Sequence, residues 1–385
     1  MGSVIDAIKT RIASAMLAHS SDPERISRRA VWLGQADDRF KHRDRSIALR
    51  MDRSRPERLT CAAVQMKATL THSGREYVDL VYRLAAKAAA AGADIVAFPE
   101  YSGLPLLGMI PGIEKTLSHA GSLDEAVGPS GDVLDVFRFI GPYADRAYRA
   151  AFSSVSRELG IYIVSGSMVL PDETVNRSAM RSLGYVFGPG GELAGRYHKT
   201  HLMPVESGWG ITPGDSASTF SIGGVIAAVP ICMDATYFET FRIARLSGAD
   251  LVIVPSANNE PYNLWYTLRG IWPRVQESQV YGIGACMVGS FAGQTFTGRS
   301  AILAPLELSP GGDGMLAQAG TYDTEEIVLA QIDIPLLHKF RADNPLRFNL
   351  PLYRKYLPAM YRSAQMARQR GVEQSTKERN DTWER

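Results

Sequence analysis

Three short segments of the chain each place a reactive side chain directly after a run of apolar residues. AFPEYSG contains Glu100, RYHKTHLMPVE contains Lys199 and Glu206, and VPICMDATYFE contains Cys232. Thiolates are nucleophiles, carboxylates accept protons and ammonium groups stabilise negative charge, so the set could carry out covalent catalysis. Taken singly, each residue has an ordinary alternative: a buried small hydrophobic residue for the cysteine, a helix cap for the glutamate, and solvated surface for the lysine.

The elements that must position these residues are predicted to be strands of an α/β fold. CAAVQM (61–66) is an apolar run of strand type, residues 75–94 show helical spacing up to a glycine stop, and IVAFPE (95–100) is a buried strand. Residues 238–256, FETFRIARLSGADLVIVPS, repeat this plan, and both copies contain Gly-Ala-Asp, at 92–94 and 248–250. The repetition suggests two similar halves around one sheet system.

Strands and helices alternate along the rest of the chain as far as about residue 339. IYIVSGSMVL (161–170) and SLGYVFGPGGELAGRYHK (182–199) are predicted to form strands, the second around a glycine-rich turn, and VYGIGACMVGSF (280–291) follows. This alternation implies a layered α/β fold with buried sheets covered by helices. We predict three parts: a basic, partly helical extension over 1–58, a domain over 59–339, and a tail over 340–385 at a subunit interface.

In this order, the three motifs resemble those of the nitrilase, or carbon–nitrogen hydrolase, superfamily. The resemblance runs from about Cys61 to Ile334. It includes Phe-Pro-Glu at 98–100, Lys-Thr-His-Leu with a glutamate seven residues after the lysine, and Pro-Ile-Cys-x-Asp at 230–234. It implies a four-layer α-β-β-α sandwich with a Glu-Lys-Cys triad at the ends of strands. It also implies that two sandwiches pair into a homo-oligomer.

The same resemblance assigns roles to the reactive residues. Cys232 would be the nucleophile, Glu100 the general base, and Lys199 with the backbone N–H of Met233 the oxyanion donors. An amide carbon is a poor electrophile, so attack by a thiolate through a thioester divides a difficult hydrolysis into two steps. A thiol with an ordinary pKa near ~8.5 needs a neighbouring base at neutral pH. Glu206 matches a second glutamate of the family, which would orient the lysine or the attacking water.

The residues after the nucleophile indicate which carbon–nitrogen bond is cleaved. Cys-Met-Asp at 232–234 resembles amidases and carbamoylases, whereas true nitrilases usually carry Cys-Trp-Glu. Carbamoyl-amino-acid hydrolases tend to have arginines three and four positions after the cysteine, where this chain has Ala235 and Thr236. A carboxylate-bearing substrate would therefore need another cation, for which Arg242 and Arg269 are candidates.

Pocket residues are expected in the segments next to the reactive ones, namely Tyr101, Met233, Tyr237, Phe238, Asn258, Asn259 and Trp265. Such aromatic and amide groups suit a small neutral or aromatic substrate. We expect hydrolysis of a small amide or carbamoyl (ureide) compound, with release of ammonia or amine. Hydrolysis of a nitrile, a glutaminase that supplies ammonia to a synthetase, and a catalytically idle scaffold are the alternatives.

Composition places the chain among ordinary globular proteins. It has 385 residues, of which 45% are hydrophobic and 21% charged, and this excludes wholesale disorder and disulfide-stapled or collagen-like classes. Cys61 and Cys286 are interpreted as core residues, and His198 and His201 as loop residues instead of metal ligands, so no metal or cofactor is predicted. Glu277 is expected to be structural. Sparse cysteines and the lack of an apolar run near the ~18 residues of a membrane helix favour a cytoplasmic protein without membrane contact.

The N-terminal extension differs from the rest in charge. Residues 1–58 contain 13 Lys and Arg residues against 8 Asp and Glu, in a chain with a net charge of +2. Because the two signs alternate instead of forming a basic block, we expect no nucleic acid partner. Apolar residues recur at helical spacing, and we expect them to cover a neighbouring subunit or the rim of the pocket. They are Val4, Ile5, Ile8, Ile12, Met16, Trp32 and Leu33.

Overall fold

The computed structural model describes residues 2–40, 58–128, 131–174, 179–264 and 270–362, with side chains from residue 11 onward. It divides into two compact units, Met1–His338 and Lys339–Arg385. All the strands and the reactive residues belong to the first unit. None of the helices in the described ranges is long and apolar enough to cross a membrane.

Fourteen strands of the described residues form one curled sheet, with neighbours in the order β4-β5-β3-β2-β1-β10-β9-β8-β7. Its two halves join where β1 and β10 run parallel and pair at Met66 and Met287. The first half and the strands that flank it are β1 (Arg58–Lys67), β2 (Ile95–Ala97), β3 (Tyr162–Val164), β4 (Met168–Pro171), β5 (Met180–Phe187), β6 (Leu193–His198) and β14 (Glu326–Asp333). The second comprises β7 (Thr219–Ile222), β8 (Val225–Ala228), β9 (Leu251–Ser256), β10 (Tyr281–Phe291), β11 (Gln294–Phe296), β12 (Ala301–Leu303) and β13 (Met315–Gln318).

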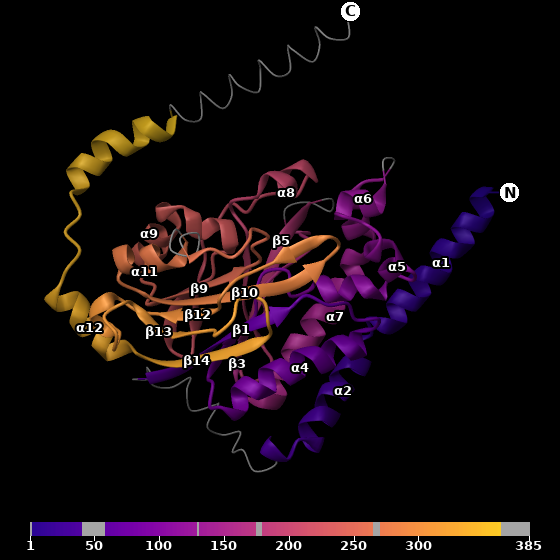
Figure 1. The fold of residues 1–385 in the computed structure, drawn as a ribbon, viewed down its shortest axis with the longest axis horizontal. Coiled ribbons are helices and arrows are strands. Elements are labelled where there is room, and N and C mark those ends of the chain that lie inside the picture. Colours follow the sequence, from indigo (N-terminus) through magenta and orange to yellow (C-terminus); the bar gives the residue numbers. More distant parts are fainter. Residues whose placement is uncertain (1, 41–57, 129–130, 175–178, 265–269, 363–385) are drawn as a thin grey trace, which may run out of the picture. The chain divides into compact units, whose positions relative to one another are not determined.

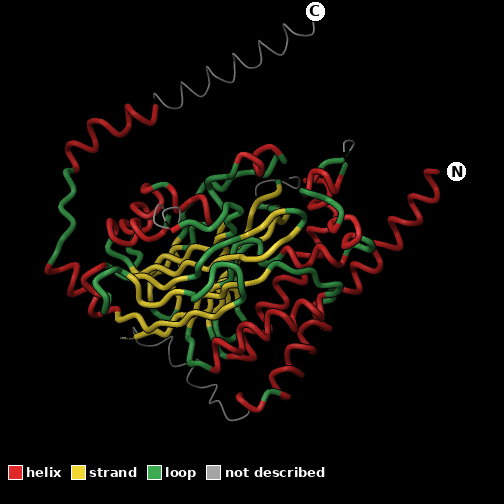
Figure 2. Tube along the Cα trace, in the orientation of Figure 1, coloured by secondary structure: helices red, strands yellow, loops and turns green. Residues whose placement is uncertain are grey.

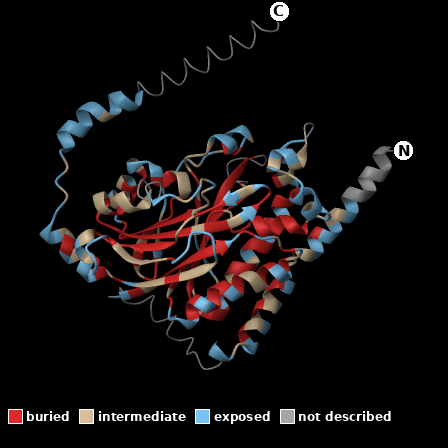
Figure 3. Cartoon of the chain, in the orientation of Figure 1, coloured by how far each residue is buried: buried red, intermediate tan, exposed pale blue. Residues whose placement is uncertain are grey.

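Three apolar clusters separate the layers of this unit. The inner faces of the two halves pack on each other through residues such as Ala63, Ile95, Ile253 and Ile283. The outer face of the first half packs on α4 (Gly74–Ala90) and α7 (Val133–Leu159), and that of the second on α9 (Phe238–Leu246) and α11 (Ile271–Ser278). Figures 1 and 2 show these helices on opposite sides of the strands, and Figure 3 shows the strands buried between them. The predicted four-layer α-β-β-α sandwich is confirmed.

The two Gly-Ala-Asp segments have the same backbone geometry. Gly92 follows α4 with φ of 91°, and Gly248 follows α9 with φ of 92°, a left-handed conformation that ends a helix at low cost when the residue is glycine. The backbone N–H of Asp94 then donates to a carbonyl of β1 and that of Asp250 to a carbonyl of β8, each at 2.8 Å. The short sequence repeat therefore marks equivalent helix-to-strand turns in the two halves of the sheet.

One predicted strand is divided in the structure. IYIVSGSMVL forms β3 and β4, which are separated around Gly166 with φ of 80°. A Cβ atom at this position would lie 1.9 Å from the carbonyl oxygen of Pro99. Glycine is thus required for the close approach of this turn to the segment that carries Glu100.

Part of the N-terminal extension packs on its own chain. α1 (Gly2–Ser20) and α2 (Pro23–Ala36) place Leu17, Ile26 and Ala30 in the apolar cluster of α4 and α7. Arg29 on α2 forms a bidentate ion pair with Asp79 on α4, at 2.7 and 3.0 Å. Among the residues at helical spacing, Ile12, Met16 and Trp32 are exposed and Leu33 is partly buried, while the side chains of residues 1–10 lie outside the described part.

The remaining helices of the first unit are short. They are η1 (Asp38–Phe40), η2 (Leu104–Met109), α5 (Ile113–Ser118), α6 (Leu123–Val127), α8 (Pro204–Gly208), η3 (Cys232–Thr236) and η4 (Leu306–Leu308). α12 (Ile334–Asp343) crosses the boundary between the two units. In the second unit residues 350–362 are helical, and the part of the predicted tail over 363–385 lies outside the described residues.

Candidate active site

The structure brings the four reactive residues of the sequence motifs to one cavity of about 200 Å³. Glu100 follows β2, Lys199 follows β6, Glu206 lies on α8, and Cys232 begins η3 after β8. These elements come from both halves of the sheet, so the cavity forms where strand ends from the two halves meet.

Lys199 is the centre of a buried ion cluster. Its Nζ donates to Glu100 Oε1 at 2.8 Å and to the two carboxylate oxygens of Glu206 at 2.8 and 2.9 Å. All three side chains are 1% exposed. A buried ammonium with two carboxylates is stable only when each charge has close partners, so these contacts fix the position of the Lys199 head group.

The carboxylates of Glu100 and Glu206 also accept hydrogen bonds from groups other than Lys199. The backbone N–H of Ala257 donates to Glu100 Oε2 at 3.0 Å, and that of Met203 donates to Glu206 Oε2 at 2.7 Å. The hydroxyl of Tyr101 donates to Glu206 Oε1. Both carboxylates are therefore held from two sides, which fixes their orientation toward Lys199 and the cavity.

Burial and the neighbouring charges together shift the pKa values of these groups. Burial raises the pKa of Glu100 above its ordinary value; the Lys199 charge opposes this shift and Glu206 adds to it. Burial also raises the pKa of Cys232, and the Glu100 charge raises it further. Burial lowers the pKa of Lys199, but Glu100, Cys232 and Glu206 together raise it by more. At neutral pH the site therefore holds a protonated thiol, a charged lysine and a carboxyl group suited to exchange a proton.

Cys232 occupies a sharp turn with φ of 45°, in the left-handed region that non-glycine residues rarely adopt. The backbone N–H of Asp234 donates to the carbonyl of Ile231 at 2.9 Å, and Asp234 Oδ2 accepts from the Ile231 N–H at 2.9 Å. These two bonds hold the turn closed, so the side chain of Cys232 borders the cavity. Strained backbone of this kind persists where its surroundings over-determine it, often at functional sites.

Asp234 also binds the loop that follows Lys199. Its Oδ1 accepts from the Thr200 hydroxyl at 2.6 Å, the His201 N–H at 2.7 Å and His201 Nδ1 at 2.8 Å. The carboxylate is 1% exposed. Burial alone would raise its pKa, but the bonds from His201 and Thr200 hold it below the ordinary value of 3.8. Sequence reasoning used Asp234 as a sign of the amidase branch and missed this linking position.

The sequence profile described as Carbon-nitrogen hydrolase matches residues 60–342. The chain belongs to the carbon–nitrogen hydrolase family. A nitrilase of Pyrococcus abyssi is 31% identical over 191 residues, which are 49% of this chain and 66% of that protein. An omega-amidase of Homo sapiens is 31% identical over 206 residues, 50% of this chain and 69% of that protein.

The fold agrees with this family. A Saccharomyces cerevisiae protein of branch 10 of the nitrilase superfamily superposes with a TM-score of 0.56 at 18% identity. The superposition covers 76% of this chain and 96% of that one. The family match begins at residue 60, so α1 and α2 lie outside it.

Of the predicted pocket residues, Tyr101, Asn258 and Asn259 line the cavity of this hydrolase. Met233 and Tyr237 are not among the described residues that line it. The ring of Tyr237 stacks on His201 with centroids 4.3 Å apart, and Phe238 is exposed. Trp265 and Arg269 lie outside the described residues, and Arg242 is absent from the described lining.

The apolar wall of the cavity was missed by the sequence analysis. It consists of Leu104, Leu123, Phe137, Met203, Val205, Trp209, Phe291 and Phe296. Met203 and Val205 stand within the motif of Lys199 and Glu206, Trp209 follows that motif by three positions, and Leu104 directly follows the motif of Glu100. The other wall residues come from separate elements that no spacing in the sequence connects.

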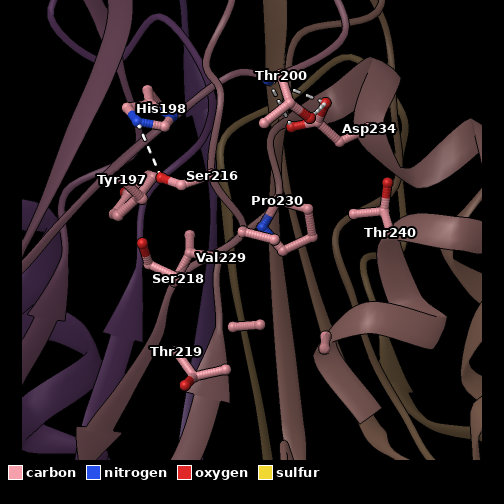
Figure 4. Close-up of a pocket in the computed structure, with 13 residues that line it drawn as sticks. Tyr197, His198, Thr200, Ser216, Ser218, Thr219, Val229, Pro230, Asp234 and Thr240 are labelled. Atoms are coloured by element: carbon pink, nitrogen blue, oxygen red, sulfur yellow. Dashed lines mark hydrogen bonds between the residues drawn. The ribbon is translucent and has the colours of Figure 1, made fainter. Parts of the chain in front are cut away.

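The two histidines next to the lysine, His198 and His201, contact polar side chains. Figure 4 shows a second cavity, of about 30 Å³, that His198 lines together with Thr200 and Asp234, a volume near one water molecule's share of the liquid. His198 Nε2 lies 3.4 Å from the Ser216 hydroxyl. In the part of the chain that the structure describes, no three His, Cys, Asp or Glu side chains are grouped to hold a metal ion.

Glu277 is linked to the turn that contains Cys232 through Arg274. It accepts from Arg274 Nη1 at 2.9 Å. The same guanidinium donates to the carbonyls of Ala235 and Thr236 at 3.2 and 2.8 Å. This ion pair therefore supports the backbone just after Cys232. Cys61 is fully buried in β1, and Cys286 lies on β10.

Proposed function

We propose that the protein hydrolyses the carbon–nitrogen bond of a small amide through a covalent thioester on Cys232. The observation that carries the proposal is the meeting of Cys232, Glu100 and Lys199 at one cavity, each oriented by bonds that leave room for a substrate beside the thiol. The omega-amidase similarity supports an amide as substrate. Such a set of groups supplies a nucleophile, a proton acceptor and a stabiliser of negative charge.

The first half of the reaction forms the thioester. As the Cys232 sulfur attacks the amide carbon, its proton passes to Glu100, and the carbonyl electrons move to oxygen. The C–N bond then breaks while Glu100 returns the proton to nitrogen, and ammonia or an amine leaves. The raised pKa values of Cys232 and Glu100 suit this exchange, because the deprotonated form of each group is a stronger base than usual and accepts a proton readily.

The second half is hydrolysis of the thioester. Glu100 accepts a proton from water as the water oxygen attacks the acyl carbon. The C–S bond breaks, the thiolate is reprotonated and the carboxylic acid leaves. Lys199, with the backbone N–H of Met233, is proposed to stabilise the oxyanion in both halves, and Glu206 to hold Lys199 in place. Tyr101, Asn258 and Asn259 are proposed to contact the substrate.

A nitrile is the second candidate substrate, favoured by the similarity to the nitrilase of Pyrococcus abyssi. Attack of Cys232 on a nitrile carbon gives a thioimidate, which needs two waters to yield acid and ammonia. A carbamoyl compound would instead form a thiocarbamate on the same cysteine. The products distinguish the three classes.

We also propose that the hydrolase is a homo-oligomer. α9 exposes Phe238, Ile243 and Leu246, which are 42%, 49% and 65% exposed. Large apolar residues recur along residues 350–361 of the second unit as well. A second copy of the chain would cover such a surface, and light scattering at micromolar concentration tests this assembly.

The experiment that tests the proposed function is a screen of small amides, carbamoyl compounds and nitriles for ammonia release. Cys232→Ala is the control in every assay. Release from amides by the wild type alone supports the proposal. Release from nitriles alone would replace it with the nitrilase alternative, and release by both proteins at equal rates would remove Cys232 from the chemistry.

A further inference from the structure

We infer that the cavity selects amides with an uncharged, apolar acyl group and rejects those whose acyl group ends in a carboxylate. In this scheme, Asp124 and Trp209 are the specificity-determining pair. The inference rests on the proposed amide hydrolysis and names the substrate class of that same site. Three properties of the described lining support it: its apolar wall, its charge, and the contact between Asp124 and Trp209.

The wall beyond the reactive groups is apolar, and half of its residues are buried. Leu104, Phe137, Phe291 and Phe296 are 6%, 2%, 8% and 7% exposed, and Leu123, Met203, Val205 and Trp209 complete it. An acyl chain on this wall exchanges water for apolar contacts, which is favourable in proportion to the area covered. A carboxylate against these apolar side chains would lose hydration without gaining a cation from them.

The charges that line the cavity also oppose an anion. The described lining carries three carboxylates, Glu100, Asp124 and Glu206, and a single cationic side chain, Lys199. Lys199 already binds Glu100 and Glu206 at 2.8 Å. A substrate carboxylate would therefore meet like charges, and the lysine could serve it only by giving up a buried partner.

Asp124 is the carboxylate that lies outside the buried cluster. It is the second residue of α6 and is exposed, and its Oδ1 accepts from Trp209 Nε1 at 2.8 Å. The Trp209 ring in turn lies 6.5 Å from the ring of Phe137 on α7. The bond thus joins α6, which precedes α7, to the residue that directly follows α8, on the apolar side of the cavity. The carboxylate of Asp124 places a negative charge there.

The size of the cavity sets the length of the acyl chain. At ~30 Å³ for each water-sized group, about 200 Å³ holds roughly six to seven non-hydrogen atoms. Pentanamide has a matching size. Succinamate is a close match in length and replaces the terminal ethyl group with a carboxylate, so the pair compares an apolar end with a charged one.

The test compares the two amides by turnover and by binding. For the wild type, kcat/KM for pentanamide is expected to exceed that for succinamate by at least about 100-fold, since the carboxylate is both desolvated and repelled. Asp124→Asn keeps an oxygen for Trp209 and removes the charge, and it should narrow this ratio about tenfold. Glu125→Gln removes the neighbouring exposed charge, which does not line the cavity, and should leave the ratio as it is.

Binding is measured separately by calorimetry on Cys232→Ala, which cannot turn substrate over. Tighter binding of pentanamide than of succinamate supports the inference, even if the wild type hydrolyses neither amide and the proposed function fails. Equal kcat/KM values for the two amides would overturn the inference while amide hydrolysis stands. Equal or tighter binding of succinamate, or the same ratio in Asp124→Asn as in the wild type, would overturn it too.

Discussion

The carboxylate of Asp234 accepts two hydrogen bonds from His201, one from its backbone N–H at 2.7 Å and one from its ring Nδ1 at 2.8 Å. The other carboxylate oxygen of Asp234 accepts from Ile231, directly before the nucleophile. One buried side chain therefore connects the loop after Lys199 to the turn of Cys232. The relative position of Lys199 and Cys232, the proposed oxyanion donor and nucleophile, depends on this link.

Asp234→Asn should reduce both stability and turnover. An amide nitrogen in place of one oxygen leaves buried donors without an acceptor, which costs about 2–4 kcal/mol of the free energy of unfolding. Turnover should fall by about 10-fold or more because the loop after Lys199 and the turn of Cys232 lose their fixed relative position. Urea unfolding and ammonia release measure the two effects. The exposed carboxylate of Asp135 provides the control, and Asp135→Asn should change stability by less than about 0.5 kcal/mol. Matching behaviour of the two variants would contradict the linking role.

The pH dependence of stability should reflect the same carboxylate. The pKa of Asp234 is lower in the folded protein than its ordinary value of 3.8, because His201 and Thr200 bond to its charged form. The unfolded chain therefore binds the proton more readily, and stability is lost as the pH falls from about 4 through the folded pKa. Asp234→Asn should lose less stability than the wild type over that range in chemical unfolding. Parallel losses in the two proteins would argue against a depressed pKa.

Glu100→Gln tests the proton acceptor. Burial raises the pKa of Cys232 more than the Glu100 charge does, so the thiol at neutral pH depends mainly on a base that takes its proton. Alkylation of Cys232 by iodoacetamide near pH 7 should slow at least about 10-fold in Glu100→Gln. The glutamine keeps the size of the side chain, and circular dichroism checks the fold. Equal alkylation rates would exclude Glu100 as the base.

Lys199→Ala should act on turnover by a different route. Loss of an oxyanion donor typically costs ~10²–10³ in turnover. The variant also leaves Glu100 and Glu206 buried without their cation, so its free energy of unfolding must be measured beside its activity. Lys87→Ala on α4, at an exposed position away from the cavity, gives the matched control. A Lys199→Ala protein with wild-type kcat would contradict the assignment.

The N-terminal helices should contribute to stability. Ile26 is 1% exposed, whereas Ile12 is 57% exposed. Ile26→Ala should cost about 2–4 kcal/mol of the free energy of unfolding, since it removes buried apolar groups and leaves a cavity against α4 and α7. Ile12→Ala should cost less than about 0.5 kcal/mol. Thermal or urea unfolding distinguishes the two, and equal effects would mean that α2 does not pack as described.

The meeting of Glu100, Lys199 and Cys232 at one cavity could be predicted from the sequence, because each stands in a motif at the end of an apolar strand. The sequence also predicted the layers, since helix and strand periodicity repeat in both halves. It could not predict the role of Asp234, because the two loops that the carboxylate joins are more than thirty residues apart. It could not predict that the ring of Tyr237 stacks on His201, since adjacency to Cys232 does not tell which way η3 turns the residues that follow.

The wall of the cavity and the place of the N-terminal helices show the same limit. Phe137, Trp209 and Phe291 come from α7, the end of α8 and β10, and their meeting depends on tertiary packing that no local pattern encodes. The apolar residues of the N-terminal extension predicted that another surface covers them, but the predicted set did not include Ile26 and Ala30. The place of these two residues against α4 and α7 followed only from the structure.

The most direct test of the central claim is the mass of the intact protein during turnover of pentanamide. The account predicts a wild-type species heavier by the pentanoyl group, located on Cys232 by peptide mapping, and no such species in Cys232→Ala. Turnover by the wild type without any adduct, or an adduct on another residue that persists in Cys232→Ala, would contradict the proposal that Cys232 is the nucleophile.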